Sequence, residues 1–233
     1  MTDFYEIIKD RTLLQEFINW LPDLQENEKF YVCLFSRRKW VKNQDNIPHS
    51  SADKNQLKRY LTNKERFVEK IEQLECKYGA YKWHGNPIPY ESMGLYITAN
   101  PRNLETAQLN SIMVLAKCVK NKHKHANPHQ EVMSEIHRTP SKKSYLLFDI
   151  DNTDKNLIKK CIDIVDGYCT VIRTRGGYHL HVHLDKAKNI KEKYWHNKIS
   201  EHSDVLGDEL TPVVGCCQGG FTPYFYYKDG KFK

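Results

Sequence analysis

The stretch from Ser144 to Leu184, SYLLFDIDNTDKNLIKKCIDIVDGYCTVIRTRGGYHLHVHL, carries the pattern that decides the fold of this chain. Its first part, Tyr145–Ile150, is expected to form a strand that ends beside two carboxylates, Asp149 and Asp151. Because successive side chains of a strand point to opposite faces, these two carboxylates share one face. A helix and a second strand are expected to follow. Paired carboxylates are the ligands that Mg²⁺ prefers, so the strand end indicates a metal site.

A third strand is predicted after a turn at Gly176-Gly177, and it carries three histidines. His179, His181 and His183 are two residues apart, which places all three on one face of the strand. Two glycines before a strand permit a tight turn and a close approach of the backbone to a ligand. For His181 and His183 taken singly we expect solvated side chains on an exposed sheet face. His179, beside the glycines, is a candidate for a hydrogen bond to a phosphate oxygen.

The composition is that of a polar, moderately basic chain. Its 233 residues carry a formal net charge of +7, and the mean hydropathy is −0.71. An excess of Lys and Arg suits a polyanionic partner such as nucleic acid. No apolar run approaches the roughly 18–20 residues of a membrane span, and the N-terminus shows no secretory signal. The seven cysteines form no CxxC pair, so we expect reduced thiols in a cytoplasmic protein that does not contact membranes.

Strand and helix signals mix without a regular βαβ rhythm, which favours an α+β fold over a doubly wound sheet. Strands are predicted at Phe30–Ser36 and Gly94–Ala99, and a polar loop is predicted from Val41 to Asn55. The Lys- and His-rich segment from Lys117 to Lys143 is expected to be a basic loop or a linker between lobes.

Three helices are predicted ahead of this basic segment. Residues 3–21 show an amphipathic pattern, and Thr62 with Glu65 forms a capping-box pattern before a second helix. The third helix, Glu105–Lys120, is expected to bury one apolar stripe. That stripe consists of Leu109, Ile112, Ala116 and Val119.

Two short motifs resemble those of a known family. Asp149-Ile150-Asp151 and Gly177-Tyr178-His179 resemble motif I (hydrophobic-Asp-x-Asp) and motif II (small-x-His) of the archaeo-eukaryotic primase superfamily, the primase-polymerases. The likeness is greatest to compact members encoded by phages and plasmids, and it covers residues 144–225. It implies a palm similar to an RNA-recognition motif beside an N-terminal α/β module. We therefore expect one bilobal unit, with the module at about 1–120, the basic loop at 120–143 and the palm at 144–233.

The same resemblance implies a DNA-dependent nucleotidyltransferase that joins ribo- or deoxynucleoside triphosphates on a single-stranded DNA template. Such an enzyme would use Mg²⁺ or Mn²⁺ and would act in the host cytoplasm, with a separate replicative helicase as a candidate partner. The implied metal ligands are Asp149, Asp151 and a third acid, for which Asp204 and Asp208 are both candidates. These four carboxylates and His179 form the expected catalytic set.

Further residues are assigned to the nucleotide and to the template. The nucleotide-binding candidates are Arg173, Arg175, Gly177, His179, Gln218 and Gly219. The template-binding candidates are Arg37, Arg38, Lys39 and Arg102. The template assignments rest mainly on charge, and a solvated basic surface is an equally weighted alternative.

Three other functions stay open on sequence grounds. Residues 148–153, FDIDNT, match the DxDxT motif of haloacid-dehalogenase phosphatases, with Asp149 as the nucleophile. His179-Leu180-His181 fits the metal motif of rolling-circle replication nickases, with Tyr194 as the residue that attacks DNA. The third is a non-enzymatic RNA-binding module that uses the basic and aromatic cluster around Trp40.

Overall fold

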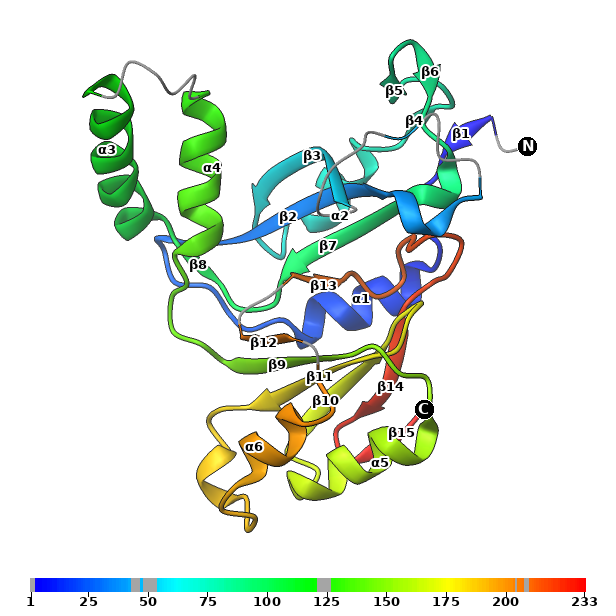
Figure 1. The fold of residues 1–233 in the computed structure, drawn as a ribbon, viewed down its shortest axis with the longest axis vertical. Coiled ribbons are helices and arrows are strands. Elements are labelled where there is room, and N and C mark those ends of the chain that lie inside the picture. The colour runs from blue at the N-terminus through cyan, green and yellow to red at the C-terminus, as the bar shows by residue number, and fades with distance from the viewer. Residues whose placement is uncertain (1–2, 43–46, 48–53, 121–126, 204, 208–209) are drawn as a thin grey trace.

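Two antiparallel sheets face each other across one helix (Figure 1). The computed structural model describes residues 3–42, 47, 54–120, 127–203, 205–207 and 210–233. Within these residues the chain mixes helices with antiparallel sheets. The predicted α+β class is therefore confirmed at this level.

The upper sheet in Figure 1 is built mainly from the N-terminal half of the chain. Its strand order is β13-β7-β2-β3, and β8 extends the start of β2. The strands are β2 Glu28–Arg37, β3 Lys54–Thr62, β7 Met93–Thr98, β8 Arg102–Asn103 and β13 Leu210–Pro212. Every residue of β7 is buried because this central strand is covered on both faces. The two strands predicted in this region, Phe30–Ser36 and Gly94–Ala99, correspond to β2 and β7.

The lower sheet is built from the C-terminal half and has the order β12-β9-β11-β10-β14-β15, with every neighbouring pair antiparallel. Along the chain its first part reads β9-α5-β10-β11-α6-β12. The strands are β9 Tyr145–Ile150, β10 Cys169–Arg173, β11 Tyr178–His183, β12 Val205–Gly207, β14 Tyr224–Lys228 and β15 Lys231–Phe232. Asp149 of β9 lies directly opposite His179 of β11.

One face of the lower sheet is covered by two helices, α5 Lys155–Ile164 and α6 Trp195–Ser200 (Figure 1). Strand residues of one parity, including Phe148, Leu180 and Val182, pack with Ile158 and Ile199 of these helices in a common apolar core. Asp154 begins α5 by accepting a hydrogen bond from the backbone of Asn156. The alternate residues of the same strands, which include Asp149 and His179, therefore face away from these helices and toward the upper sheet.

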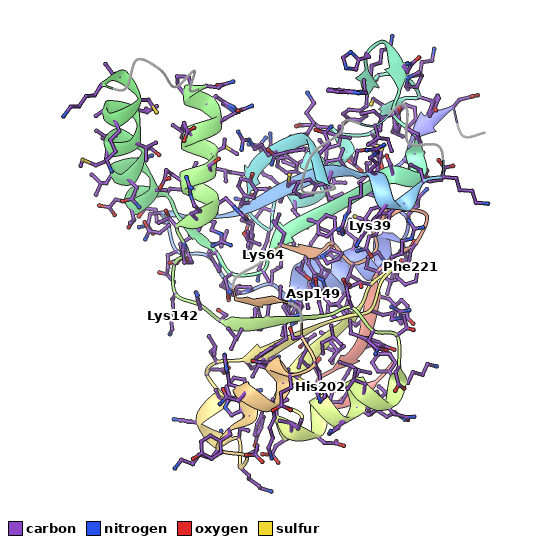
Figure 2. The ribbon with its side chains drawn as sticks, viewed as in Figure 1. Lys39, Lys64, Lys142, Asp149, His202 and Phe221 are labelled. Carbon is purple, nitrogen blue, oxygen red and sulfur yellow. The ribbon has the colours of Figure 1, made fainter. Side chains whose placement is uncertain are left out.

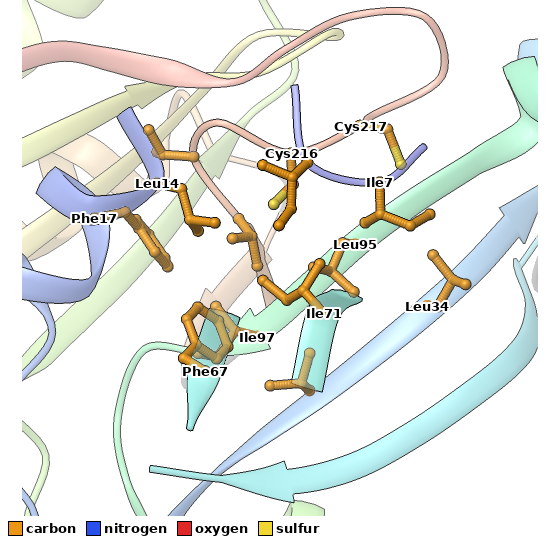
Figure 3. Packing of buried hydrophobic residues seen from close by; sticks show 14 of the residues in the cluster. Ile7, Leu14, Phe17, Leu34, Phe67, Ile71, Leu95, Ile97, Cys216 and Cys217 are labelled. Carbon is orange, nitrogen blue, oxygen red and sulfur yellow. The ribbon is translucent and has the colours of Figure 1, made fainter. Parts of the chain in front are cut away.

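Helix α1, Arg11–Trp20, fills the space between the two sheets. Leu14 and Phe17 of this helix pack near Ile97 of the upper sheet (Figure 3). Phe225 of the lower sheet belongs to the same core. Burial of apolar side chains is the main favourable term in folding, so this shared core couples the two sheets.

The predicted helix over residues 3–21 begins later than expected, at Arg11. Phe4–Tyr5 is instead strand β1, which pairs with β4, Cys76–Lys77. Asp10 has an extended backbone, and its carboxylate accepts hydrogen bonds of 2.9 Å from the backbone N–H groups of Thr12 and Leu13. This cap starts the helix, and the apolar residues before it belong to an extended segment.

The capping-box prediction at Thr62 is also wrong. Thr62 is the last residue of β3, and the second helix, α2 Phe67–Glu72, begins after a turn. The Asn63 side chain accepts the backbone hydrogen bond of Arg66 at 3.2 Å and so closes the turn before the helix, whose N-cap residue, Arg66, makes no side-chain capping bond. The shorter elements are β5 Lys82–Trp83, β6 Asn86–Pro87, and 3-10 turns at Arg38–Trp40, Tyr90–Ser92 and Ala187–Asn189.

Two helices form a hairpin that projects from the upper sheet, and its buried residues Ala107, Met133 and Ile136 pack with Tyr31 and Cys33 of β2 (Figure 1). The two helices are α3 Leu104–Lys120 and α4 Pro128–Arg138. The predicted helix at Glu105–Lys120 is present, but all four residues of its expected buried stripe, Leu109, Ile112, Ala116 and Val119, are exposed. Much of the predicted basic loop is α4, which Asn127 caps and Pro128 opens at a position where proline is favoured.

The C-terminal part of the chain contributes to both sheets. Strand β12 pairs with β9 of the lower sheet, whereas β13 pairs with β7 of the upper sheet. Isolated bridges join Ile8 to Cys216 and Gly94 to Gln218. The segment 210–218, which the predicted palm boundaries include, therefore lies against the N-terminal module.

All seven cysteines lie within the described residues and are free thiols, five of them buried. Burial raises the pKa of the Cys33 thiol to about 12, as expected for a core cysteine. In the part of the chain that the structure describes, no helix combines the length and the apolar character that crossing a membrane requires.

The Asp10 cap gives a test of this arrangement. We expect Asp10→Ala to lower the free energy of unfolding by about 1 kcal/mol, because two backbone N–H groups lose their acceptor. Asp10→Asn, which keeps a side-chain oxygen, is the matched control and should retain most of the stability. Urea denaturation followed by circular dichroism measures both, and equal losses in the two variants would contradict the capping role.

Candidate active site between the two sheets

A cleft opens where the two sheets face each other, and residues from both sheets line it. It encloses about 540 Å³ of empty space, including its mouth. In Figure 2, Asp149 is labelled on the lower sheet and Lys39 on the upper part of the molecule. The lining residues are Arg37, Lys39, Trp40, Tyr96, Asp149, Asp151, Thr174, Gly176, His179, Leu210 and Gln218.

The wall formed by the lower sheet carries the two carboxylates and His179. The Nε2 atom of His179 lies 3.3 Å from Oδ1 of Asp149, and its Nδ1 atom lies 3.1 Å from the Thr211 hydroxyl oxygen. With the proton on Nε2, the ring donates to Asp149, and Nδ1 accepts from Thr211. His179 is 6% exposed, whereas the Asp149 side chain is 30% exposed at the cleft. The imidazole is thus fixed in orientation beside a carboxylate that solvent can reach.

The glycine turn brings Asp151 to the same wall. A Cβ atom on Gly177 would lie 1.9 Å from the backbone oxygen of Ile150, which no side chain tolerates. A Cβ atom on Gly176 would lie 3.1 Å from Oδ1 of Asp151. The close approach predicted for this turn is therefore an approach to the chain's own strand end, and it leaves Asp151 beside the turn. Glycine is therefore required at Gly177 for packing, and Gly177 is not among the described lining residues of the cleft.

The opposite wall is cationic and aromatic. Its centre is Trp40, whose ring has the guanidinium carbon of Arg37 at 5.1 Å and that of Arg175 at 5.4 Å from its centroid. Both distances are within the range of cation–π attraction. A Cβ atom on Gly219, whose φ is +60°, would lie 2.6 Å from the Trp40 ring. Gly219 therefore permits the tryptophan to pack rather than lining the cleft itself.

Gln218 and Tyr96 tie the two walls together. The amide of Gln218 donates to the Tyr96 hydroxyl at 3.2 Å, and its oxygen accepts from the backbone of Arg175 at 2.7 Å. Arg37 also donates to the Tyr96 hydroxyl, at 3.4 Å. Gln218 is 4% exposed and Tyr96 is 5% exposed, so these polar groups are buried and satisfied at the base of the cleft. Burial raises the pKa of Tyr96, which keeps its hydroxyl protonated and able to donate.

Several predicted residues lie elsewhere. Arg173 donates to the backbone oxygens of Thr174 and Gly177 and so holds the glycine turn from outside the cleft lining. Arg102 is 1% exposed, and this burial removes it from a role in contacting template phosphates. Arg38 follows Arg37 in a 3-10 turn and is not part of the described lining. Asp204 and Asp208 lie outside the described residues.

The basic segment has one further feature. Lys142 and Lys143, at its end, line a second hollow of about 870 Å³ with Tyr145, His183 and Lys186. This hollow shares no lining residue with the cleft and lies at the opposite end of β9. Lys142 is labelled in Figure 2.

Sequence reasoning missed four residues of the cleft region: Tyr96, Thr174, Leu210 and Thr211. Tyr96 and Thr211 lie on paired strands, β7 and β13, that are more than 100 residues apart in the chain. Their proximity depends on long-range strand pairing, which leaves no local signal. Thr174 could have been found, because it precedes the glycine turn and accepts the backbone hydrogen bond of Gly177 at 3.1 Å.

The prediction that His181 and His183 are solvated is wrong. His181 is fully buried among Trp20, Tyr145 and His179, because α1 covers this face of the sheet. Neither of its ring nitrogens makes a well-formed hydrogen bond within the described residues, although the backbone near His179 and Thr170 offers weak partners. Burial lowers the pKa of His181 well below its usual range, so the ring is neutral. His183 is half-buried and contacts the Thr170 hydroxyl at 2.9 Å.

The described residues include no group of three or more His, Cys, Asp and Glu side chains placed to hold a metal ion. The two carboxylates at the cleft are Asp149 and Asp151, and both predicted third ligands fall outside the described part. The described residues place a pair of carboxylates, Asp149 and Asp151, on one wall of the cleft. Arg37 and Lys39 line the other wall, and Arg175 packs over the ring of Trp40 without lining the cleft.

The buried His181 predicts a pH dependence of stability. Its pKa is lower in the folded chain than in the unfolded chain, so the unfolded chain binds more protons at acid pH. The contribution of His181 to the free energy of unfolding should be fully present above pH 6.5. Below that pH the free energy of unfolding should decline, by at most about 1.4 kcal/mol per pH unit from this group. His181→Leu should flatten that decline in urea unfolding between pH 7.5 and about 5. An unchanged slope would show that other groups, such as His183, cause it.

Comparisons with family models, with curated proteins and with solved structures gave no match to this chain.

Proposed function

We propose that this chain is a nucleotidyltransferase of the primase-polymerase type, which extends or starts a strand on a single-stranded DNA template. The observation that carries the proposal is the composition of one cleft. Asp149, Asp151 and His179 line it from one side, and Arg37 and Lys39 line it from the other. Transfer of a nucleotide needs groups that position the reacting oxygens and groups that hold a triphosphate, and these residue types can do both.

The fold supports this proposal. The connectivity β9-α5-β10-β11-α6-β12, with the spatial order β12-β9-β11-β10, is a split βαβ arrangement with both helices on one face. This is the arrangement we expect of a palm similar to an RNA-recognition motif. In such a palm the two motifs would lie on adjacent central strands, as Asp149 and His179 do here.

The residues at the cleft fit a hard divalent cation. Asp149 and Asp151 would hold Mg²⁺ or Mn²⁺ through carboxylate oxygens, with either Asp204 or Asp208 as the proposed third ligand. The bound cation would neutralise charge on the phosphates and favour attack by a hydroxyl. Asp149 is reachable from solvent and Asp151 lies at the glycine turn, so both can accept a ligand without disrupting the sheet.

The remaining residues of the cleft would bind and orient the nucleotide. His179, held by Thr211 through Nδ1, presents its Nε2–H at the cleft, where it can donate to a phosphate oxygen in place of Asp149. Arg37 and Lys39 would pair with the triphosphate, with Arg175 fixing Trp40 from behind. The reaction forms a bond from a strand hydroxyl to the α-phosphate and releases pyrophosphate.

The nickase and phosphatase alternatives receive less support. For a nickase, Tyr194 would have to reach His179 and His181, yet it begins α6 on the helix-covered side of the sheet, and the histidines face the other way. For a phosphatase of the dehalogenase type, β9 would open an α/β domain, whereas both its neighbours, β11 and β12, are antiparallel. A pure RNA-binding module would leave two carboxylates in the cleft that repel phosphate.

The first test is nucleotide incorporation on single-stranded DNA with labelled ATP or dATP and Mg²⁺ or Mn²⁺. We expect metal-dependent products from the wild type, and a loss of about 100-fold or more in Asp149→Asn/Asp151→Asn. Asp154→Asn is the matched control, because it removes a nearby carboxylate but keeps the α5 cap. Products that persist in the double variant, or wild-type protein that makes none, would contradict the proposal.

A second test concerns the cationic wall. Lys39→Ala should raise the KM for the nucleotide about fivefold with a smaller change in kcat, since a phosphate contact is lost while the acid pair is intact. Lys188→Ala removes an exposed lysine that is not among the described lining residues of the cleft and serves as the control. Steady-state kinetics at fixed template measures both variants. An equal KM in the two would remove Lys39 from the nucleotide site.

A further inference from the structure

The outer face of helix α3 is apolar and exposed. Leu109, Ile112, Met113 and Val119 are 62%, 64%, 61% and 81% exposed. Exposed large apolar side chains are common singly, but here four of them gather on one helix of 17 residues. The opposite side of α3, with Ala107 and Ser111 buried, is the side that packs on α4 and the body. The described residues therefore leave one complete face of this helix without a covering element.

The spacing of that face is the spacing of a helix–helix seam. Leu109, Ile112, Ala116 and Val119 follow one another at intervals of three, four and three residues, so they form a single stripe along the helix. Met113 lies beside the stripe at its centre. A stripe of this kind is buried when a second helix packs along it. The buried contacts of the hairpin with β2 involve Ala107, Met133 and Ile136, none of which belongs to the stripe, so the stripe has room for such a helix.

The charges at the two ends of α3 specify the partner. Glu105 lies in the first turn, and Lys117 and Lys120 lie in the last. Glu105 and Lys120 are both exposed. Consider a second copy of α3 that runs antiparallel to the first, with the two-fold axis passing through Met113. Glu105 of one copy would then lie within about one residue of Lys120 of the other, which is about 1.5 Å measured along the helix. The symmetry makes this pairing twice.

The same arrangement matches the sizes of the apolar side chains. With the axis at Met113, Leu109 of one copy comes within about one residue of the level of Ala116 of the other, so a large side chain packs beside a small one. Met113 meets its own symmetry mate, and methionine adapts to such a contact. We therefore propose that this chain self-associates through an antiparallel, two-fold symmetric pairing of α3. This proposal is independent of the proposed function, because α3 contributes no residue to the described cleft lining.

The interface is small, since it consists mainly of one helix pair. Complexes at the low end of interface area are weak, so we expect a concentration-dependent dimer rather than a permanent one, observable by sedimentation velocity over roughly 1–200 µM. Ile112→Glu should leave the full-length protein monomeric throughout this range. Asn110→Glu adds the same charge on the same helix at an exposed position away from the stripe, and it should still dimerise.

Cross-linking tests the orientation. In a Cys118→Ser background, Met113→Cys places two thiols at the two-fold axis, where mild oxidation should join most of the dimer. Val119→Cys places its two thiols about 18 Å apart along the axis, too far for a disulfide. We expect cross-linked dimer on a denaturing, non-reducing gel for Met113→Cys and little for Val119→Cys. Equal cross-linking of both, as a parallel pair would give, overturns the proposal.

Charge reversal tests the pairing of the ends. Glu105→Lys alone, or Lys120→Glu alone, should weaken self-association roughly tenfold, because like charges then face each other twice. The combined Glu105→Lys/Lys120→Glu variant should restore it. Thermal melts of each variant check that the helix hairpin is intact. A wild type that stays monomeric at every concentration, or a combined variant that fails to regain association, overturns the proposal.

Discussion

The structure depends on one constraint, which is that the chain contributes neighbouring segments to two different sheets. Strand β12 pairs with β9 in the lower sheet, and β13 pairs with β7 in the upper sheet. Helix α1 fills the space between, with Phe17 packed between strands of both sheets. Since each sheet is held against the same helix and the same C-terminal segment, the acidic wall and the basic wall are fixed opposite each other. Neither sheet alone would form the cleft.

This constraint explains why the polar residues of the cleft are both buried and satisfied. Thr211 comes from β13 and meets His179 of β11, so the hydrogen bond that orients the imidazole crosses from one sheet to the other. Gln218 is bridged to Gly94 of the upper sheet and likewise accepts a hydrogen bond from the backbone of Arg175, which follows β10 of the lower sheet. Fully satisfied networks of this kind hold side chains in place at little cost, whereas a single missing partner would leave a buried group unpaired. The proposed chemistry needs such a rigid frame, because positioning is most of what a nucleotidyltransferase contributes.

The features that depend on local sequence patterns could be predicted. Period-two spacing was sufficient to predict that Asp149 and His179 belong to strands, and β9 and β11 confirm those strands. The sequence marked Arg37 and Lys39 as a basic cluster but could not predict that this cluster faces the carboxylates, because the two sheets meet through long-range pairing such as that of β7 with β13. Nor could it say what covers an apolar stripe, which is why the exposed face of α3 and the buried ring of His181 were both mispredicted. A periodic pattern shows that a face is apolar or polar, and the partner of that face is decided by the tertiary fold.

The most direct measurement of the central claim is a crystal structure with Mn²⁺ and a non-hydrolysable nucleoside triphosphate, in which anomalous scattering locates the metal. The account predicts a manganese peak bonded to Asp149 and Asp151, with the triphosphate between it and the side chains of Arg37 and Lys39. Metal and nucleotide bound elsewhere, for example in the lysine-lined hollow beside Lys142, would contradict it.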